Sequence, residues 1–373
     1  MSVFDADGPA RIEQLFAAQL DAGLHHGAQL AVYRGEDRVL SLTGGEVGPD
    51  GDPVTPDQKF VLFSCTKPYT AACVHHLVDE GDLAYDDPLT EYWPEYADPG
   101  TEKAETTVAD VLTHRAGLAL TDLDRQPDTW TDWDASVSIL EDATPQGLGE
   151  PAYHPVSFGF LAGELVRRVT GRSVGRYARD HIFEPIEMDD THIGLPESEP
   201  DDVATLTGFA DPDRCRTPDS GLGLDRGDSA ATFNREPIHR AEIPAAGGVG
   251  TAADMARFYA CLANGGRIGD DRVLDTDTVA TLTRVHTQTE RDPTLGVPRR
   301  YGLGVVRAGT AHDKYGTLAP DAVFGHGGLG SSVAWADPET GVAFAYVTNG
   351  IRDPIEHRQR VNELADAVRH VYA

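Results

Sequence analysis

The two ends of the chain carry mirrored patterns of helix and strand. Residues 9–24 place apolar side chains at helical spacing, and residues 28–45 alternate as two strands around a short turn. At the other end, residues 331–349 show two strands around a Pro- and Gly-containing turn, followed by an amphipathic helix at 354–372. Because an antiparallel sheet buries its apolar face under helices, this symmetry predicts one antiparallel sheet shared by both ends of the chain.

The middle of the chain follows a different pattern. From about residue 64 to residue 190 helical periodicity predominates, whereas residues 197–240 are rich in Asp, Pro and Gly and are expected to form a loop. A helical region thus lies between the two halves of a sheet domain. The expected helices span residues 69–81, 107–115, 133–142, 157–170 and 173–182.

This organisation predicts an α+β fold built as a single unit over residues 1–373. We expect a sheet subdomain of about 1–60 and 241–373, flanked by helices, and a mostly helical subdomain of about 61–240.

Composition excludes several classes of protein. The 373 residues include 31 Lys and Arg against 61 Asp and Glu, a net charge of −30 that repels nucleic acid. No apolar run is long enough to span a membrane and no secretory signal is visible, so a cytoplasmic location is expected. The cysteines contain no CxxC pair, which argues against a disulfide scaffold or a zinc knuckle; they are Cys65, Cys73, Cys215 and Cys261.

The cations give a further indication of habitat. Only four of the 31 are lysines, and acidic residues occur throughout the chain. Abundant Asp, few lysines and a net charge of −30 together predict adaptation to molar salt, where screening over roughly 3 Å removes self-repulsion.

The clearest chemical motif is an S-x-x-K sequence formed by Ser64 and Lys67. A serine hydroxyl needs a neighbouring base to become a nucleophile, and residues three apart on a helix share a face. Burial lowers the pKa of a lysine, which can then act as that base. Pro68 is tolerated only near a helix start, so we expect a helix to begin at Ser64, whose backbone N–H groups would be free to bind a ligand.

Two later segments complete a possible site. Tyr153 lies in a loop just before the helix expected at 157–170, where its phenol could pass a proton between the nucleophile and a leaving group. The glycine-rich segment 324–330, which contains His326, precedes a strand and could present backbone N–H groups to an oxyanion.

Together these motifs resemble the serine β-lactamase/penicillin-binding-protein superfamily, in the branch that joins class C β-lactamases to family VIII carboxylesterases. The resemblance covers nearly the whole chain and implies a β-lactamase/transpeptidase-like fold with the active site between the sheet domain and the helical domain. Other segments that match this branch are residues 60–96, 109–118, 181–195 and 245–266.

The resemblance also implies roles for individual residues. Ser64 would be the acylated nucleophile, Lys67 its base and Tyr153 the proton shuttle. The backbone N–H groups of Ser64 and Leu329 would form the oxyanion hole. His326, Gly327 and Gly328 would occupy the positions of the family's K-T-G triad.

Two departures from the family pattern bear on the substrate. The tyrosine motif ends in Pro155, which offers no donor to an acylamino group, and His326 replaces a lysine with a weaker, pH-dependent charge. Since an uncharged ester needs neither group, we expect a carboxylesterase that acts on short-chain esters through an acyl-enzyme. The alternatives are a β-lactamase, a D-amino-acid peptidase or a non-catalytic scaffold that keeps the fold.

Rival catalytic centres find little support in the sequence. There is no G-x-S-x-G motif and no H-E-x-x-H motif, so no metal and no organic cofactor are expected. His114 is expected to buttress a turn, and Asp86 and Asp87 to form one. The expected partner is a small-molecule ester or amide, while the sequence specifies neither the natural substrate nor the oligomeric state.

Overall fold

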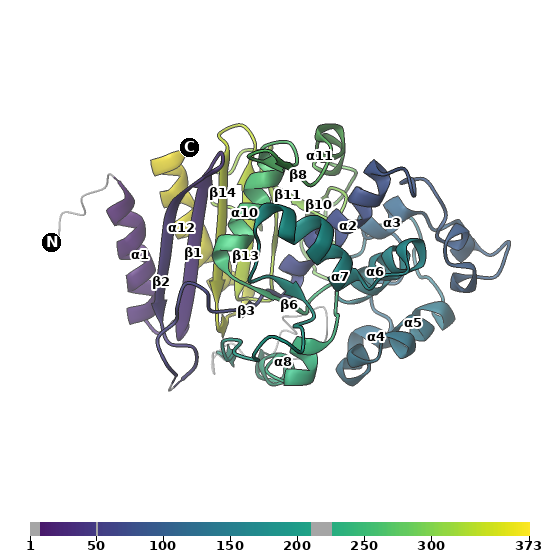
Figure 1. The fold of residues 1–373 in the computed structure, drawn as a ribbon, viewed down its shortest axis with the longest axis horizontal. Helices are drawn as coiled ribbons and strands as arrows, with labels where there is room; N and C mark the ends of the chain where they lie inside the picture. Colours follow the sequence, from purple (N-terminus) through teal and green to yellow (C-terminus); the bar gives the residue numbers. More distant parts are fainter. Residues whose placement is uncertain (1–7, 50, 210–225) are drawn as a thin grey trace.

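A large antiparallel sheet forms one half of the molecule (Figure 1). The computed structural model describes residues 8–49, 51–209 and 226–373, and within them the sheet has eight strands in the order β2-β1-β14-β13-β12-β11-β10-β9. In that order the strands are Asp37–Gly45, Gly27–Arg34, Val342–Thr348, Ser332–Asp337, Phe324–Gly327, Val306–Arg307, Arg299–Tyr301 and Thr287–Thr289.

The two ends of the chain meet at the second and third strands of this sheet. Strand β1 pairs antiparallel with β14, in a register that runs from Ala28 opposite Thr348 to Arg34 opposite Val342. The hairpins β1–β2 and β13–β14 are those expected from the sequence, so the shared antiparallel sheet is confirmed.

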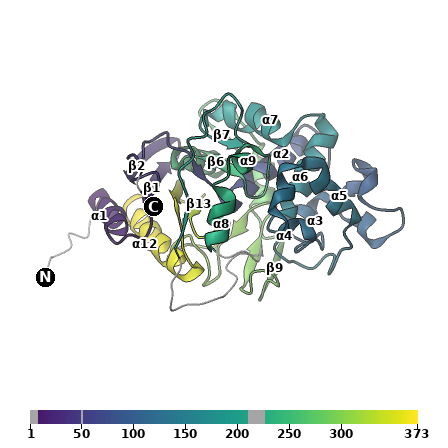
Figure 2. The same ribbon diagram turned by 90° about the horizontal axis from the view of Figure 1, so that it is seen from below.

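Helices cover both faces of the sheet, and the size of the strand side chains decides which helix lies where. Bulky side chains of β13 and β14, such as Trp335 and Phe344, pack against α1 (Pro9–Asp21) and α12 (Pro354–Tyr372). Alanines alternate with them and face α10 (Ala252–Ala263), which can therefore approach the sheet closely. These alanines are Ala334, Ala336, Ala343 and Ala345. Figure 1 shows α10 across the sheet, and Figure 2 shows α1 and α12 side by side beneath it.

The other half of the molecule is mainly helical and lies away from both termini (Figure 1). Its centre is α2 (Lys67–Asp79), which packs against α6 (Ser157–Thr170) and α7 (Val174–Ala178). The remaining α-helices are α3 (Val108–Leu112), α4 (Asp122–Arg125), α5 (Trp133–Asp142), α8 (Arg226–Phe233), α9 (Glu236–Arg240) and α11 (Thr276–Leu282). The division into two subdomains at about residues 60 and 241 stays a prediction.

Short strands link the two halves. A three-stranded sheet, β3-β6-β4, joins Phe60–Val61, Gly248–Gly250 and His192–Ile193. Two strand pairs are smaller still: β15 (Gly350–Ile351) with β5 (Thr207–Gly208), and β7 (Arg267–Ile268) with β8 (Asp271–Arg272).

Some of the expected boundaries were wrong. The helix expected at 107–115 ends at Leu112, because His114 adopts a positive φ of 60°. The helix expected at 173–182 continues after Ala178 as a wider π-turn, Arg179–Phe183. The segment 197–240, expected to be a loop, contains α8, α9 and β5, while its residues 210–225 lie outside the described part.

Two expectations from composition can be compared with the described residues. Of the cysteines, Cys65, Cys73 and Cys261 are buried and free, while Cys215 lies outside the described residues. No helix in the described part of the chain combines the length and the apolar character needed to cross a bilayer.

Candidate active site

Ser64 lies at a sharp bend where the chain enters α2. It sits in a 3₁₀ turn, Phe63–Thr66, and the α-helix itself begins at Lys67, three residues later than the sequence predicted. The bend arises at Phe63, whose φ of 49° is unusual for a bulky residue. The centre of its ring lies 4.7 Å from that of Phe233. Pro68 lies in the first turn of α2, where a missing N–H costs nothing.

Lys67 is fully buried and reaches back to Ser64. Its Nζ lies 3.2 Å from the Ser64 Oγ, 2.7 Å from the Pro155 carbonyl oxygen and 3.1 Å from that of Ala245. Burial lowers the pKa of Lys67 to about 7. A neutral amine has two N–H bonds and one lone pair. With two carbonyls accepting the N–H bonds, the lone pair faces the Ser64 hydroxyl.

A buried carboxylate near Lys67 was not predicted from the sequence. One oxygen of Asp124, in the short helix α4, accepts the N–H groups of Val156 and Ser157 at 2.9 and 3.4 Å. The charge of Asp124 raises the pKa of Lys67 and so opposes the effect of burial. Burial also raises the pKa of Asp124 itself, to about 6. Asp124 thus fixes the start of α6 and limits how far the pKa of Lys67 falls.

Tyr153 faces the same hydroxyl from the helical side. Its phenol faces Ser64, whose hydroxyl partly offsets the effect of burial on the pKa of Tyr153, and the Lys67 Nζ lies 4.9 Å from the centre of its ring. Burial raises the pKa of Tyr153, so the phenol holds its proton at neutral pH. Its backbone N–H donates to Asp292, a fully buried carboxylate on the segment before β10. No local motif marks Asp292, and the sequence did not predict it.

Two histidines support the Tyr153 loop in their neutral form. The His154 Nδ1 donates to the Ala152 carbonyl at 2.6 Å, and its Nε2 accepts the N–H of Leu118 at 3.0 Å. Burial lowers the pKa of His154 to about 4. The His114 Nδ1 accepts the N–H of His154, and its ring packs 4.8 Å from that of Tyr153. His114 therefore buttresses this turn, as the sequence suggested.

The glycine-rich segment lies opposite, along β12. Its first four residues form the strand β12 itself. A Cβ on Gly328 would lie 2.7 Å from the Leu62 carbonyl oxygen and 3.1 Å from the Phe63 Cβ, so only glycine lets this strand pack against the turn of Ser64. Within the described residues, no hydrogen bond occupies the backbone N–H of Ser64 or of Leu329, the two groups expected to form an oxyanion hole.

His326 lies on β12 and carries no charge at neutral pH. Its Nδ1 lies 2.9 Å from the Gly327 carbonyl oxygen, while its buried Nε2 has no hydrogen-bond partner among the residues that the structure describes. Burial, with a smaller contribution from the Lys67 charge, lowers the pKa of His326 to about 3. The weak, pH-dependent charge that the sequence suggested is therefore absent near pH 7, because the imidazole is desolvated.

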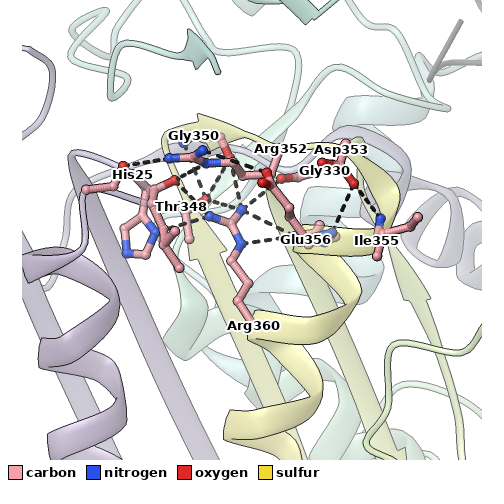
Figure 3. A network of polar contacts seen from close by, with 12 residues as sticks. His25, Gly330, Thr348, Gly350, Arg352, Asp353, Ile355, Glu356 and Arg360 are labelled. Carbon is pink, nitrogen blue, oxygen red and sulfur yellow. Dashed lines mark hydrogen bonds and ion pairs between the residues drawn. The ribbon is translucent and has the colours of Figure 1, made fainter. Parts of the chain in front are cut away.

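Arg360, on α12, anchors the backbone that follows Leu329. Figure 3 shows its buried guanidinium among oxygens that belong to the ends of several strands. It donates to the carbonyls of Gly330 and Gly350 at 2.8 and 2.9 Å and to the Thr348 hydroxyl at 3.1 Å. Gly330 also accepts the N–H of Arg352. The position of Leu329 therefore depends on contacts made through Gly330.

The predicted site residues thus come together around one cavity. Ser64, Tyr153, His326 and Leu329 line it together with Gly327 and Gly328, and Lys67 lies buried behind Ser64. No cluster of three or more His, Cys, Asp or Glu side chains suited to a metal ion occurs in the described ranges.

Comparisons with known proteins agree on the family. The profile of the beta-lactamase family matches residues 12–368. The chain is 36% identical over 372 residues to the Mycobacterium tuberculosis protein named esterase/beta-lactamase LipL. This alignment covers 95% of this chain and 84% of the relative.

Solved structures show the same fold. A penicillin-binding protein homolog from Caulobacter crescentus superposes with a TM-score of 0.82 at 34% identity, over 97% of this chain and 98% of the other. A family VIII carboxylesterase superposes with a TM-score of 0.84 at 28% identity over the full length of both chains. The chain therefore belongs to the beta-lactamase family and is a serine hydrolase of the β-lactamase and penicillin-binding-protein superfamily.

Proposed function

We propose that this protein is a carboxylesterase that hydrolyses short-chain esters through an acyl-enzyme on Ser64. The Ser64 Oγ attacks the ester carbonyl while Lys67 takes up its proton, and the N–H groups of Ser64 and Leu329 bind the oxyanion. The alcohol leaves with a proton delivered through Tyr153. Water then attacks the acyl-enzyme, its proton follows the same route, and the carboxylic acid is released.

The observation that carries this proposal is the environment of Lys67. Carbonyl oxygens of Pro155 and Ala245 accept hydrogen bonds from its Nζ, and the Ser64 Oγ lies 3.2 Å away, on the side that remains for the lone pair of the neutral amine. With a pKa of about 7, roughly half of the amine is neutral at pH 7, and this fraction is still basic enough to accept a proton. A scaffold without catalytic function has no need for a desolvated lysine in this position.

The preference for esters rests on two positions of the site, Pro155 and His326. Pro155 has no N–H to offer an acylamino group, and its carbonyl is occupied by Lys67. The neutral His326 offers no cation at the position where the family's lysine stands. A solved relative named a family VIII carboxylesterase supports this preference, and the relative named an esterase/beta-lactamase is consistent with either activity.

The test compares hydrolysis of p-nitrophenyl butyrate with that of a chromogenic cephalosporin in molar KCl. We expect turnover of the ester, its loss in Ser64→Ala, and little turnover of the lactam. Ser41→Ala, an exposed serine on β2, is the control and keeps full activity. Faster hydrolysis of the lactam would identify a β-lactamase instead. A folded protein that turns over neither substrate and is not labelled at Ser64 by an acylating probe would be a scaffold.

A further inference from the structure

The cavity beside Ser64 gathers positive charge in a chain that is strongly acidic elsewhere. Acidic residues outnumber Lys and Arg by 61 to 31 over the whole sequence. Among the described residues that line the cavity the ratio is reversed, because Asp313 is the one acidic residue there. The cations that line it are Arg226, Arg299, Lys314 and Arg352.

Several of these charged groups are already engaged. The Asp313 carboxylate accepts hydrogen bonds from the N–H groups of Gly309 and Thr310 and from the Thr310 hydroxyl. These bonds stabilise the turn at 309–313 and satisfy the carboxylate. Arg352 pairs with Glu356 at 3.7 Å and donates to backbone carbonyls. Arg226 has interactions of its own as well.

Lys314 and Arg299 differ from these residues. The Lys314 Nζ lies 3.5 Å from the Gly328 carbonyl oxygen, and a Cβ on Gly327 would lie 3.3 Å from the same Nζ. Its ammonium thus lies against β12, next to Leu329. Arg299 donates to the Pro298 carbonyl at 3.0 Å. Neither side chain forms an ion pair with a carboxylate in the described part of the chain.

The two cations also influence each other. Burial and the Arg299 charge together lower the pKa of Lys314 to about 8. Arg299 contributes to the lowered pKa of His326 too. Two like charges facing one cavity, with no carboxylate beside them, are an arrangement that a bound anion stabilises.

From this geometry we infer that the ester substrate carries a carboxylate, which binds between Lys314 and Arg299 while its ester carbonyl lies at Ser64. The inference rests on the proposed esterase function and narrows it. A neutral His326 alone would favour an uncharged ester. The positive charge of this site comes from two other residues, Arg299 on β10 and Lys314 in the segment before β12, so the preferred ester becomes an anionic one. The acyl chain must be short, because Lys314 lies against the strand that leads to Leu329.

The test uses two esters of similar length at constant ionic strength and pH 7. Mono-p-nitrophenyl glutarate ends in a carboxylate, and p-nitrophenyl butyrate is neutral. We expect wild type to prefer the glutarate ester. Lys314→Gln and Arg299→Gln should each lower kcat/KM for it by about 10- to 100-fold, with less than about a threefold change for butyrate.

Arg300→Gln is the matched control. Arg300 neighbours Arg299 on β10, but its guanidinium pairs with Asp321 and donates to the Ala308 carbonyl, outside the cavity. The same loss of charge there should leave both esters unaffected. Equal losses on both esters in the Lys314 and Arg299 variants, or no preference for the glutarate ester in wild type, would overturn the anion subsite. Ser64-dependent hydrolysis of butyrate would still support the proposed function.

A binding measurement tests the subsite even if neither ester is hydrolysed. Free glutarate should raise the Tm of Ser64→Ala, and the rise should disappear when Lys314→Gln or Arg299→Gln is added. No rise in Tm with glutarate in the Ser64→Ala protein would contradict the inference independently of catalysis.

Discussion

The Asp292 carboxylate binds the backbone of Tyr153. Its Oδ2 accepts the Tyr153 N–H at 2.9 Å and the Tyr301 hydroxyl at 2.8 Å, while its Oδ1 accepts the N–H groups of Thr294 and Leu295. Four donors surround a carboxylate that has no exposed surface. The loop of Tyr153 is thereby fixed to the segment before β10, the strand that also carries Arg299.

Asp292→Asn should therefore impair catalysis more than substrate binding. The amide keeps one acceptor oxygen but turns an NH₂ group toward two N–H or O–H donors, which displaces Tyr153. We expect kcat for p-nitrophenyl butyrate to fall by about 10- to 100-fold with KM changed less than about threefold. Steady-state kinetics with Asp271→Asn, an exposed acid on β8, as the control measure this. A normal kcat in a folded Asp292→Asn protein would rule out the positioning role.

The pH dependence of kcat/KM should report Lys67. The amine acts as a base only when neutral, and its pKa is about 7. Activity should therefore fall about tenfold per pH unit below pH 7 and level off above it. His326, with a pKa of about 3, should add no limb between pH 5 and 9. Measurements of kcat/KM from pH 5 to pH 9 test this prediction. If kcat/KM fell already below about pH 9, Lys67 would titrate like an ordinary lysine and the prediction would be wrong.

Replacing Lys67 should exchange activity for stability. Its folded pKa of about 7 lies below the ordinary 10.5, so the unfolded chain binds more protons between these values, and the contribution of Lys67 to stability improves as pH rises through that window. Burying the Lys67 ammonium therefore destabilises the folded protein at low pH, and Lys67→Met removes this destabilisation. We expect an inactive protein whose free energy of unfolding at pH 6 increases by about 1–4 kcal/mol, with a smaller gain at pH 9.5. Urea titrations at both pH values measure the difference, and a loss of stability at pH 6 would contradict it.

Arg360 should matter for stability and for the site together. Arg360→Met removes one donor from each of the carbonyls of Gly330 and Gly350, which keep the Arg352 N–H and the Thr348 hydroxyl, at a cost of about 1–3 kcal/mol. Arg358→Met is the control, because Arg358 forms no hydrogen bond or ion pair within the described residues and should change stability by less than about 0.5 kcal/mol. Thermal unfolding compares the two variants, and equal Tm values would refute the anchoring role.

The excess of acidic residues should make folding depend on salt. With a net charge of −30, self-repulsion is strong at 0.1 M salt, where screening extends over about 10 Å, and weak at 1 M, where it extends over about 3 Å. We expect Tm to rise steadily as KCl increases from 0.1 to 3 M. The same series in tetramethylammonium chloride is the control, since screening requires no particular cation. A Tm that is independent of salt would remove the argument for a halophilic habitat.

The sequence predicted those features that local patterns encode. Alternating apolar residues in 28–45 and 331–349 were enough to predict two hairpins, and their mirrored order was enough to predict the pairing of β1 with β14. The spacing of Ser64 and Lys67 likewise predicted their contact, now measured at 3.2 Å. Each of these inferences depends on neighbours in the chain or on a simple rule of sheet construction.

Features that depend on distant contacts were beyond the sequence. Asp124 and Asp292 meet the site from segments 32 and 139 residues away from their backbone partners, and nothing in their own surroundings distinguishes them from other acidic residues. The late start of α2 depends on the left-handed conformation of Phe63, which a bulky residue adopts only when the surrounding packing imposes it. The sequence could not predict that Lys314 and Arg299 line the same cavity, because the fold alone brings these two segments together.

The pairing of β1 with β14 also has a consequence for synthesis. Ala28 emerges early from the ribosome, but its partner Thr348 follows 320 residues later. The sheet, and with it the approach of β12 to Ser64, can be completed only after nearly the whole chain has been made. The nascent chain must keep β1, a strand buried over seven of its eight residues in the finished fold, from aggregating for most of that time, and an unfinished chain gains no hydrolytic site.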